Sequence, residues 1–168
     1  MHETRKKYLT VALISAVVVV LDQVTKYVVC ASLPLHSRVE IIDGFLNLVH
    51  VRNTGIAFGL LKQLGNQYRL LALAAVCGVA FFLLVFTITQ IKKCNRMQTA
   101  GLALILGGAV GNLVDRIRFG SVIDFIDAHW LSAYHWPAFN IADSAITVGI
   151  FVVVTAELLN YKRHAKQP

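Results

Sequence analysis

The stretch FNIADSAITVGIFVVV, residues 139–154, places an amide and a carboxyl group three residues apart at the mouth of a long apolar run. The run predicts a membrane-spanning helix that begins close to Asn140 and Asp143. A carboxyl group that enters a hydrocarbon environment is costly unless it is neutralised, paired or functional. Asp143 therefore marks a candidate functional site.

The composition is that of an integral membrane protein. Hydrophobic residues make up 57% of the 168 residues, and the mean hydropathy is +0.64, which is too apolar for an ordinary soluble domain. The lysines and arginines lie in short clusters between apolar runs and form no continuous basic face, so we expect no nucleic acid partner. The cysteines show no CxxC spacing and the histidines form no HExxH motif, so we expect no disulfide framework, metal or other cofactor.

Four apolar segments are long enough to cross a hydrocarbon core of about 30 Å. We predict spans at about residues 8–31, 68–90, 98–117 and 139–161, within a single membrane domain that covers residues 1–168. Acidic and basic residues inside the first segment argue that it is a retained helix and not a signal peptide. Basic clusters near both ends of the chain and in the link between the second and third spans predict that both termini are cytoplasmic.

Two segments are predicted to lie on the outer side of the membrane. Residues 36–60 are rich in β-branched residues and contain an Asp-Gly turn signal at 43–44, which predicts a small β-hairpin or sheet. Residues 118–137 are apolar and aromatic but interrupted by acids, so we expect this segment to lie along the membrane interface.

Polar residues from three predicted helices fall at one depth near the outer side. Within each helix they are three or four residues apart and therefore share one face. They are Asp22 and Lys26 in the first span, Asn112, Asp115 and Arg116 in the third, and Asn140 and Asp143 in the fourth. We expect the three faces to meet. Our interpretation of Asp22 and Asp115 is structural: the first pairs with Lys26, and the second pairs with Arg116 or another cation.

Asp124 and Asp143 are acids in apolar surroundings without a basic partner close in sequence. Two neighbouring carboxyl groups cannot both ionise cheaply, so one keeps its proton while the other can activate a water molecule. The pair predicts an aspartic peptidase. A proton-coupled transporter or channel that uses the two aspartates is the alternative, although the inner halves of the spans are almost purely apolar. A non-enzymatic membrane assembly factor is a second alternative.

Five blocks, in order along nearly the full length, resemble the bacterial lipoprotein signal peptidase family, also called signal peptidase II. They are DQxxK at 22–26, NTGIAF at 53–58, GGAxGNLxDR at 107–116, VIDF at 122–125 and PAFNIADS at 137–144. The resemblance implies a mainly α, four-transmembrane-helix bundle in the bacterial inner membrane. It also implies a periplasmic β-cradle, a short interfacial helix and an active site at the periplasmic face.

The same resemblance implies roles for individual residues. Asp124 and Asp143 correspond to the catalytic pair, and the supporting or substrate-binding residues are Asn53, Gly55, Asn112, Asp115, Arg116, Asn140, Asp22 and Lys26. The implied substrate is a prolipoprotein with a diacylglyceryl cysteine, cleaved just before that cysteine. Membrane lipids and cyclic peptide antibiotics such as globomycin are further implied partners, and we expect a monomer.

Overall fold

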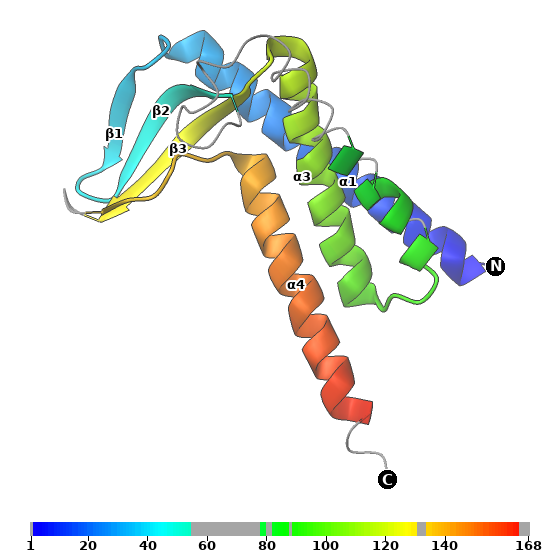
Figure 1. Ribbon diagram of the computed structural model, residues 1–168. Coiled ribbons are helices and arrows are strands. Elements are labelled where there is room, and N and C mark those ends of the chain that lie inside the picture. The colour runs from blue at the N-terminus through cyan, green and yellow to red at the C-terminus, as the bar shows by residue number, and fades with distance from the viewer. Residues whose placement is uncertain (1, 55–77, 80–81, 88, 131–133, 165–168) are drawn as a thin grey trace.

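Long apolar helices and a small antiparallel sheet make up the computed structural model, which describes residues 2–54, 78–79, 82–87, 89–130 and 134–164 (Figure 1). Three of the described helices are long and apolar enough to cross a membrane: α1 (His2–Ser32), α3 (Arg96–Phe119) and α4 (Ile141–His164). They match the first, third and fourth predicted spans. Most of the second predicted span, 68–90, lies outside the described residues.

Local signals fix both ends of α3. At its start the Asn95 side chain accepts a hydrogen bond from the backbone of Gln98, and the Gln98 side chain accepts one from the backbone of Asn95. This reciprocal capping box satisfies two backbone donors that a helix start leaves open. At its end Gly120 adopts a left-handed conformation, with φ 68°, and its N–H donates to the carbonyl of Arg116, so the chain leaves the helix and enters a strand directly.

Four antiparallel strands form the sheet in the order β1-β2-β3-β4. The strands are β1 (Arg38–Ile42), β2 (Leu46–Asn53), β3 (Val122–Trp130) and β4 (Tyr134–His135). Gly44, with φ 66°, lies in the turn between β1 and β2, as the Asp-Gly signal predicts. The hairpin predicted within 36–60 is therefore confirmed for the residues that the structure describes.

Most of residues 118–137, the segment predicted to lie along the membrane interface, belongs to the sheet. β3 pairs along β2, from Leu46 opposite Ala128 to Asn53 opposite Val122. The backbone groups of this apolar segment are thereby satisfied by another strand. No helix occurs among the described residues between α3 and α4, so the interfacial helix implied by the resemblance does not lie in that part of the chain.

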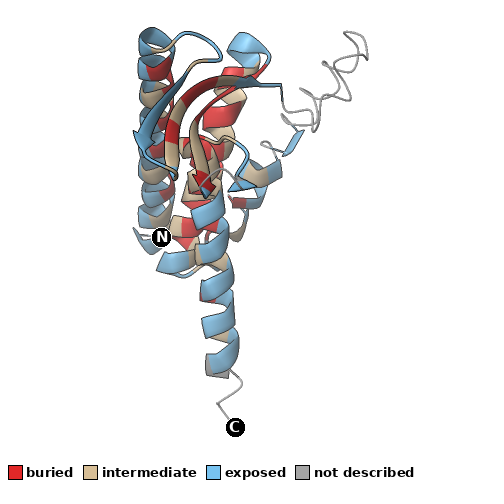
Figure 2. Ribbon diagram, turned by 90° about the vertical axis from the view of Figure 1, so that its left-hand side faces the viewer, coloured by how far each residue is buried: buried red, intermediate tan, exposed pale blue. Residues whose placement is uncertain are grey.

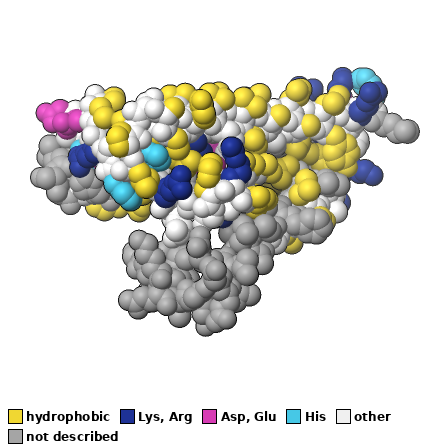
Figure 3. Space-filling view, turned by 90° about the horizontal axis from the view of Figure 1, so that it is seen from above, with side chains coloured by type: hydrophobic (Ala, Val, Ile, Leu, Met, Phe, Trp, Pro, Cys, Tyr) yellow, Lys and Arg dark blue, Asp and Glu magenta, His cyan; other side chains and the backbone are white. Residues whose placement is uncertain are grey.

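The sheet lies where α1 and α3 end and α4 begins, whereas the two chain ends lie at the other end of the helices (Figure 1). Figure 2 shows buried residues gathered where the helices meet the sheet, and a largely exposed C-terminal half of α4. Apolar side chains on that half, such as Leu158 (59% exposed), are largely uncovered by protein. Hydrophobic side chains also form much of the visible surface in Figure 3. Such a surface suits lipid.

Glycines let α3 approach both of its neighbours. A Cβ atom added at Gly107 would meet the backbone of Ser15 on α1, and one at Gly108 would meet the carbonyl oxygen of Ala142 on α4. Gly101 and Gly149 face each other lower in the α3–α4 contact. The small-residue face of the third span is therefore a packing face, as small residues in membrane helices usually are.

Replacing Gly108 with alanine is expected to destabilise the fold by about 1–3 kcal/mol, because the added methyl group overlaps a backbone atom that cannot move aside. The matched control is Gly78→Ala, since a Cβ there meets nothing within 4 Å. Unfolding midpoints of the two variants in the same detergent provide the measurement. Equal midpoints would contradict the close α3–α4 contact.

Candidate active site

Asn140 and Asp143 form the start of α4. The Asp143 N–H donates to the Asn140 side-chain oxygen at 3.0 Å, and the Asn140 N–H donates to Asp143 Oδ2 at 3.3 Å. This is a second reciprocal cap, with aspartate in the third helical position. It fixes the Asp143 side chain beside the N-terminus of a helix, where the helix dipole favours negative charge.

Asp124 is brought to the same place by strand pairing. It lies on β3 opposite Val51 of β2, and it is 2% exposed. Two residues further along β3, Ile126 exchanges backbone hydrogen bonds with Phe139, the residue before Asn140. The polypeptide that enters α4 is therefore paired to the strand that carries Asp124.

Carboxamides link the two carboxyl groups. Asn140 Nδ2 donates to Asp124 Oδ1 at 2.8 Å, while the backbone and side chain of Asn140 also hold Asp143. Asn53, at the end of β2, donates to Asp124 Oδ2 at 3.0 Å. Asn112 on α3 donates to Asp143 Oδ1 at 2.8 Å. Each carboxyl group thus accepts from amide donors of two different residues.

Burial sets the protonation behaviour of Asp124. Its pKa is raised from 3.8 to about 6, chiefly because burial penalises the charged form and, to a smaller extent, because Asp143 is negatively charged. The hydrogen bonds from Asn53 and Asn140 and the charge of Lys26 oppose this shift. Asp124 can therefore hold a proton at mildly acidic pH, where an exposed aspartate is ionised.

A buried ion cluster lies behind the carboxyl pair. Lys26 Nζ is 2.7 Å from Asp22 Oδ2 and 2.8 Å from Asp115 Oδ2, and none of these three side chains is more than 2% exposed. Asp115 thus pairs with Lys26, the other cation that the sequence interpretation left open, and not with Arg116. Lys26 also donates to Asn112 Oδ1 at 3.2 Å. The ammonium group thereby helps to orient the amide that holds Asp143.

The carboxylates of this cluster also accept hydrogen bonds from backbone N–H groups of α4 and β3. Asp22 Oδ1 accepts from the N–H of Ala142 in the first turn of α4, at 3.0 Å. Asp115 Oδ2 accepts from the N–H of Ile123 on β3, at 3.1 Å. The two elements that carry the carboxyl pair are thus both fixed by the cluster.

Arg116 contacts this network through a backbone atom. The Arg116 guanidinium donates to the backbone oxygen of Asn112 in its own helix, at 3.4 Å. Gly55 lies outside the described residues. The other predicted site residues form one connected network: Asp22, Lys26, Asn53, Asn112, Asp115, Asp124, Asn140 and Asp143.

Gln23 belongs to the network, and the sequence interpretation did not assign it a role. Its side-chain amide donates to Asp115 Oδ1 at 2.9 Å and to the Gly111 carbonyl at 3.2 Å. The sequence signal that could have identified it is its position, because Gln23 follows Asp22 directly in an otherwise apolar run. In the part of the chain that the structure describes, no group of three or more His, Cys, Asp or Glu side chains is arranged to hold a metal ion.

Apolar helices that present two amide-linked carboxyl groups at one end of their bundle fit the class of membrane-embedded hydrolases that use acid–base chemistry. Comparison with known proteins identifies the family. The model of the signal peptidase (SPase) II family matches residues 14–159. The chain therefore belongs to the signal peptidase II family.

Individual relatives are similar in sequence to this chain over most of their length. The lipoprotein signal peptidase of Syntrophus aciditrophicus is 46% identical over 150 residues, which cover 89% of this chain and 92% of that protein. The lipoprotein signal peptidase of Desulforapulum autotrophicum is 43% identical over 148 residues, with coverages of 88% and 91%. A bacterial membrane enzyme solved by the in meso method at 2.3 Å resembles this structure with a TM-score of 0.77 at 32% identity, covering 95% of this chain and 93% of its own.

Replacing Lys26 with methionine is expected to destabilise the protein by about 3–5 kcal/mol, because two buried carboxylates lose their only ammonium partner among the described residues. The control is Lys6→Met, which removes an exposed lysine from the same helix. Chemical unfolding in detergent, followed by tryptophan fluorescence, provides the measurement. If both variants unfold at the same denaturant concentration, the cluster does not stabilise the fold.

Proposed function

We propose that Asp124 and Asp143 are the catalytic pair with which this signal peptidase removes the signal peptide from prolipoproteins. The substrate carries diacylglycerol on a cysteine, and the bond just before that cysteine is cleaved. The observation that carries this assignment is Asn140, which hydrogen bonds to both carboxyl groups. Carboxyl groups held in common by one residue can act on a single water molecule and a single peptide bond.

The two environments suggest different starting states. Asp124 is the buried carboxyl whose pKa is raised to about 6, so it is assigned the proton. Asp143 is assigned the ionised form, because it accepts hydrogen bonds from Asn112 and Asn140 at a helix N-terminus. This division provides one general base and one general acid.

The reaction then follows from proton balance. Asp143 removes a proton from the water whose oxygen attacks the scissile carbonyl carbon, while Asp124 donates its proton to the carbonyl oxygen. A tetrahedral diol forms, with Asp143 protonated and Asp124 ionised. Asp143 next protonates the amide nitrogen, the carbon–nitrogen bond breaks, and one diol hydroxyl returns its proton to Asp124. The starting states are restored and no external reactant besides water is consumed.

The membrane arrangement proposed here has four spans, with the sheet and the carboxyl pair at the periplasmic side of the inner membrane. Supporting this orientation, basic residues such as Lys6, Lys7 and Lys162 lie at the ends of α1 and α4 remote from the sheet. Short clusters of this kind mark cytoplasmic ends. The site would then lie where a signal-peptide helix ends and its lipidated cysteine begins.

The transporter alternative is less well supported. A proton path would need polar side chains that continue from the carboxyl pair toward the other side of the membrane. Among the described residues, the buried ionic network ends with Asp22 and Lys26, and the buried α1 side chains nearer the N-terminus are Val11 and Val18. The assembly-factor alternative predicts that asparagine can replace either aspartate at little cost.

Asp124→Asn and Asp143→Asn are each expected to lower the rate of precursor cleavage by at least about 10²–10⁴-fold, because each removes one partner in proton transfer. The control is Asp43→Asn, which changes an exposed aspartate in the β1–β2 turn. Cleavage of a diacylglyceryl-modified precursor by purified protein in lipid provides the measurement. Retained cleavage in either correctly folded variant would overturn the catalytic pair.

Asn53→Leu is expected to move the pH dependence of kcat/KM. Asn53 donates to the Asp124 carboxylate and lowers its pKa, so its loss raises that pKa above the wild-type value of about 6. Because Asp124 must be protonated at the start, kcat/KM falls as pH rises through this pKa, and the fall should occur at higher pH in the variant. A wild-type rate that instead rises with pH through this range would assign the starting proton to Asp143.

A further inference from the structure

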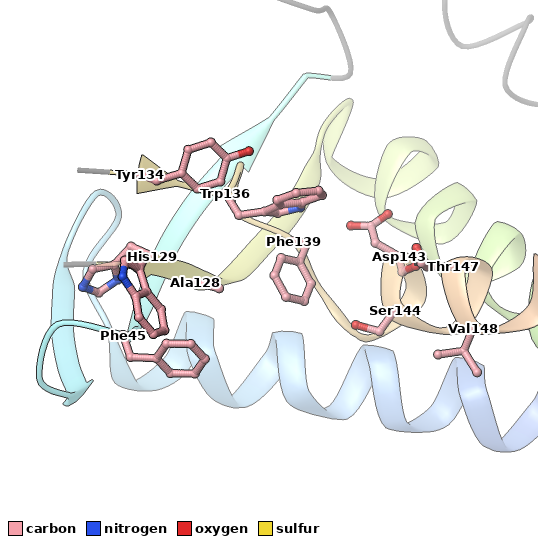
Figure 4. Close-up of a pocket in the computed structure, with 11 residues that line it drawn as sticks. Phe45, Ala128, His129, Tyr134, Trp136, Phe139, Asp143, Ser144, Thr147 and Val148 are labelled. Carbon is pink, nitrogen blue, oxygen red and sulfur yellow. Dashed lines mark hydrogen bonds between the residues drawn. The ribbon is translucent and has the colours of Figure 1, made fainter. Parts of the chain in front are cut away.

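A cavity of about 520 Å³ lies between the far end of the sheet and the first turns of α4 (Figure 4). Asp143 is one of the residues that line it, so the cavity begins at the proposed catalytic pair. Among the described residues that line it, Asp143 and His129 are the only acidic or basic side chains. We refer to this space as the α4 cavity.

The α4 side of the cavity includes two hydroxyl residues, Ser144 and Thr147, whose protons already have partners within the helix. Ser144 Oγ donates to the carbonyl of Asn140 at 2.9 Å, and Thr147 Oγ1 donates to the carbonyl of Asp143 at 2.9 Å. Both hydroxyl protons are therefore used within the helix. A polar ligand backbone would find few free donors on this side.

The opposite wall is aromatic. Phe45, Trp130, Tyr134 and Trp136 line it, and each is 47–68% exposed. In a membrane protein such residues favour the boundary between lipid and water. His129 also belongs to this wall, but it is buried and its Nδ1 is 3.1 Å from Asn47 Nδ2. The amide nitrogen of Asn47 can only donate a hydrogen bond, so Nδ1 of His129 is the acceptor.

The α4 side of the cavity leads along the helix to exposed apolar side chains. Ser144, Thr147 and Val148 lie on one face of α4, and Phe151 is the next residue on that face. Val148 is 52% exposed and Phe151 is 70% exposed. One end of this apolar path is therefore at Asp143, and the other end opens onto the surface that faces hydrocarbon.

We propose that the α4 cavity holds an acyl chain of the diacylglyceryl group on the substrate cysteine while the neighbouring peptide bond is cleaved. This inference rests on the proposed function. A chain anchored at the scissile bond could run along α4 into the bilayer without leaving an apolar environment. An extended peptide would leave its backbone groups without partners there, and a helix about 10–12 Å wide would fill this volume with only about one turn.

Val148→Trp tests the inference because it places a large side chain in the cavity, away from the carboxyl pair. Val154→Trp is a closely matched control: the same change on the same helix, at a residue that is 50% exposed and does not line the cavity. Both variants and the wild type are assayed on one precursor peptide that carries either two long acyl chains or two four-carbon chains. Asp124→Asn serves as the inactive reference.

The expected result is a loss of about tenfold or more in kcat/KM for Val148→Trp on the long-chain precursor relative to the short-chain precursor, mainly through KM. Val154→Trp should show no such difference. An equal loss on both precursors, or no loss on either, would overturn the acyl assignment. A loss that follows the size of signal-peptide side chains would assign the cavity to the signal peptide instead. Failure of the wild type to cleave any lipidated precursor would count against the proposed function itself.

Discussion

The Lys26 ammonium, buried between Asp22 and Asp115, is the interaction on which the rest of the structure depends. Burying two carboxylates and one ammonium costs desolvation free energy unless further donors satisfy the carboxylate oxygens. Besides the Gln23 side chain, these donors are the backbone N–H groups of Ala142 and Ile123. The groups that complete the cluster therefore also determine where α4 starts and where β3 leaves α3, and these are the elements that carry the proposed catalytic pair.

Helical spacing made much of this site predictable. Polar residues three or four apart in an apolar run can only share one face, and faces at one depth must meet if their polar groups are to be satisfied. The contacts of Lys26 with Asp115 and of Asn112 with Asp143 bear out that expectation. Local capping signals, such as Asn140 with Asp143, could likewise be read from neighbouring residues.

Contacts between residues far apart in sequence could not be predicted in the same way. From the sequence, residues 122–130 are predicted as an interfacial segment without a secondary structure, because their strand conformation depends on pairing with β2, which is far away in sequence. The partner of Asp115 stayed open for the same reason, since Arg116 is adjacent in sequence whereas Lys26 approaches from another helix. The role of Gln23 depends on the same approach of α1 to α3.

The four buried or half-buried aspartates of the network differ in their partners, and this difference explains how they can have different roles. Asp22 and Asp115 share the Lys26 cation, which gives them a structural role. Asp124 and Asp143 accept from the neutral amides of Asn53, Asn112 and Asn140. An amide donor fixes the position of a carboxyl group without supplying the positive charge that would oppose its protonation. A pair held by amides can therefore keep its geometry while a proton passes between its members and the substrate, which a pair held by lysine could not do as readily.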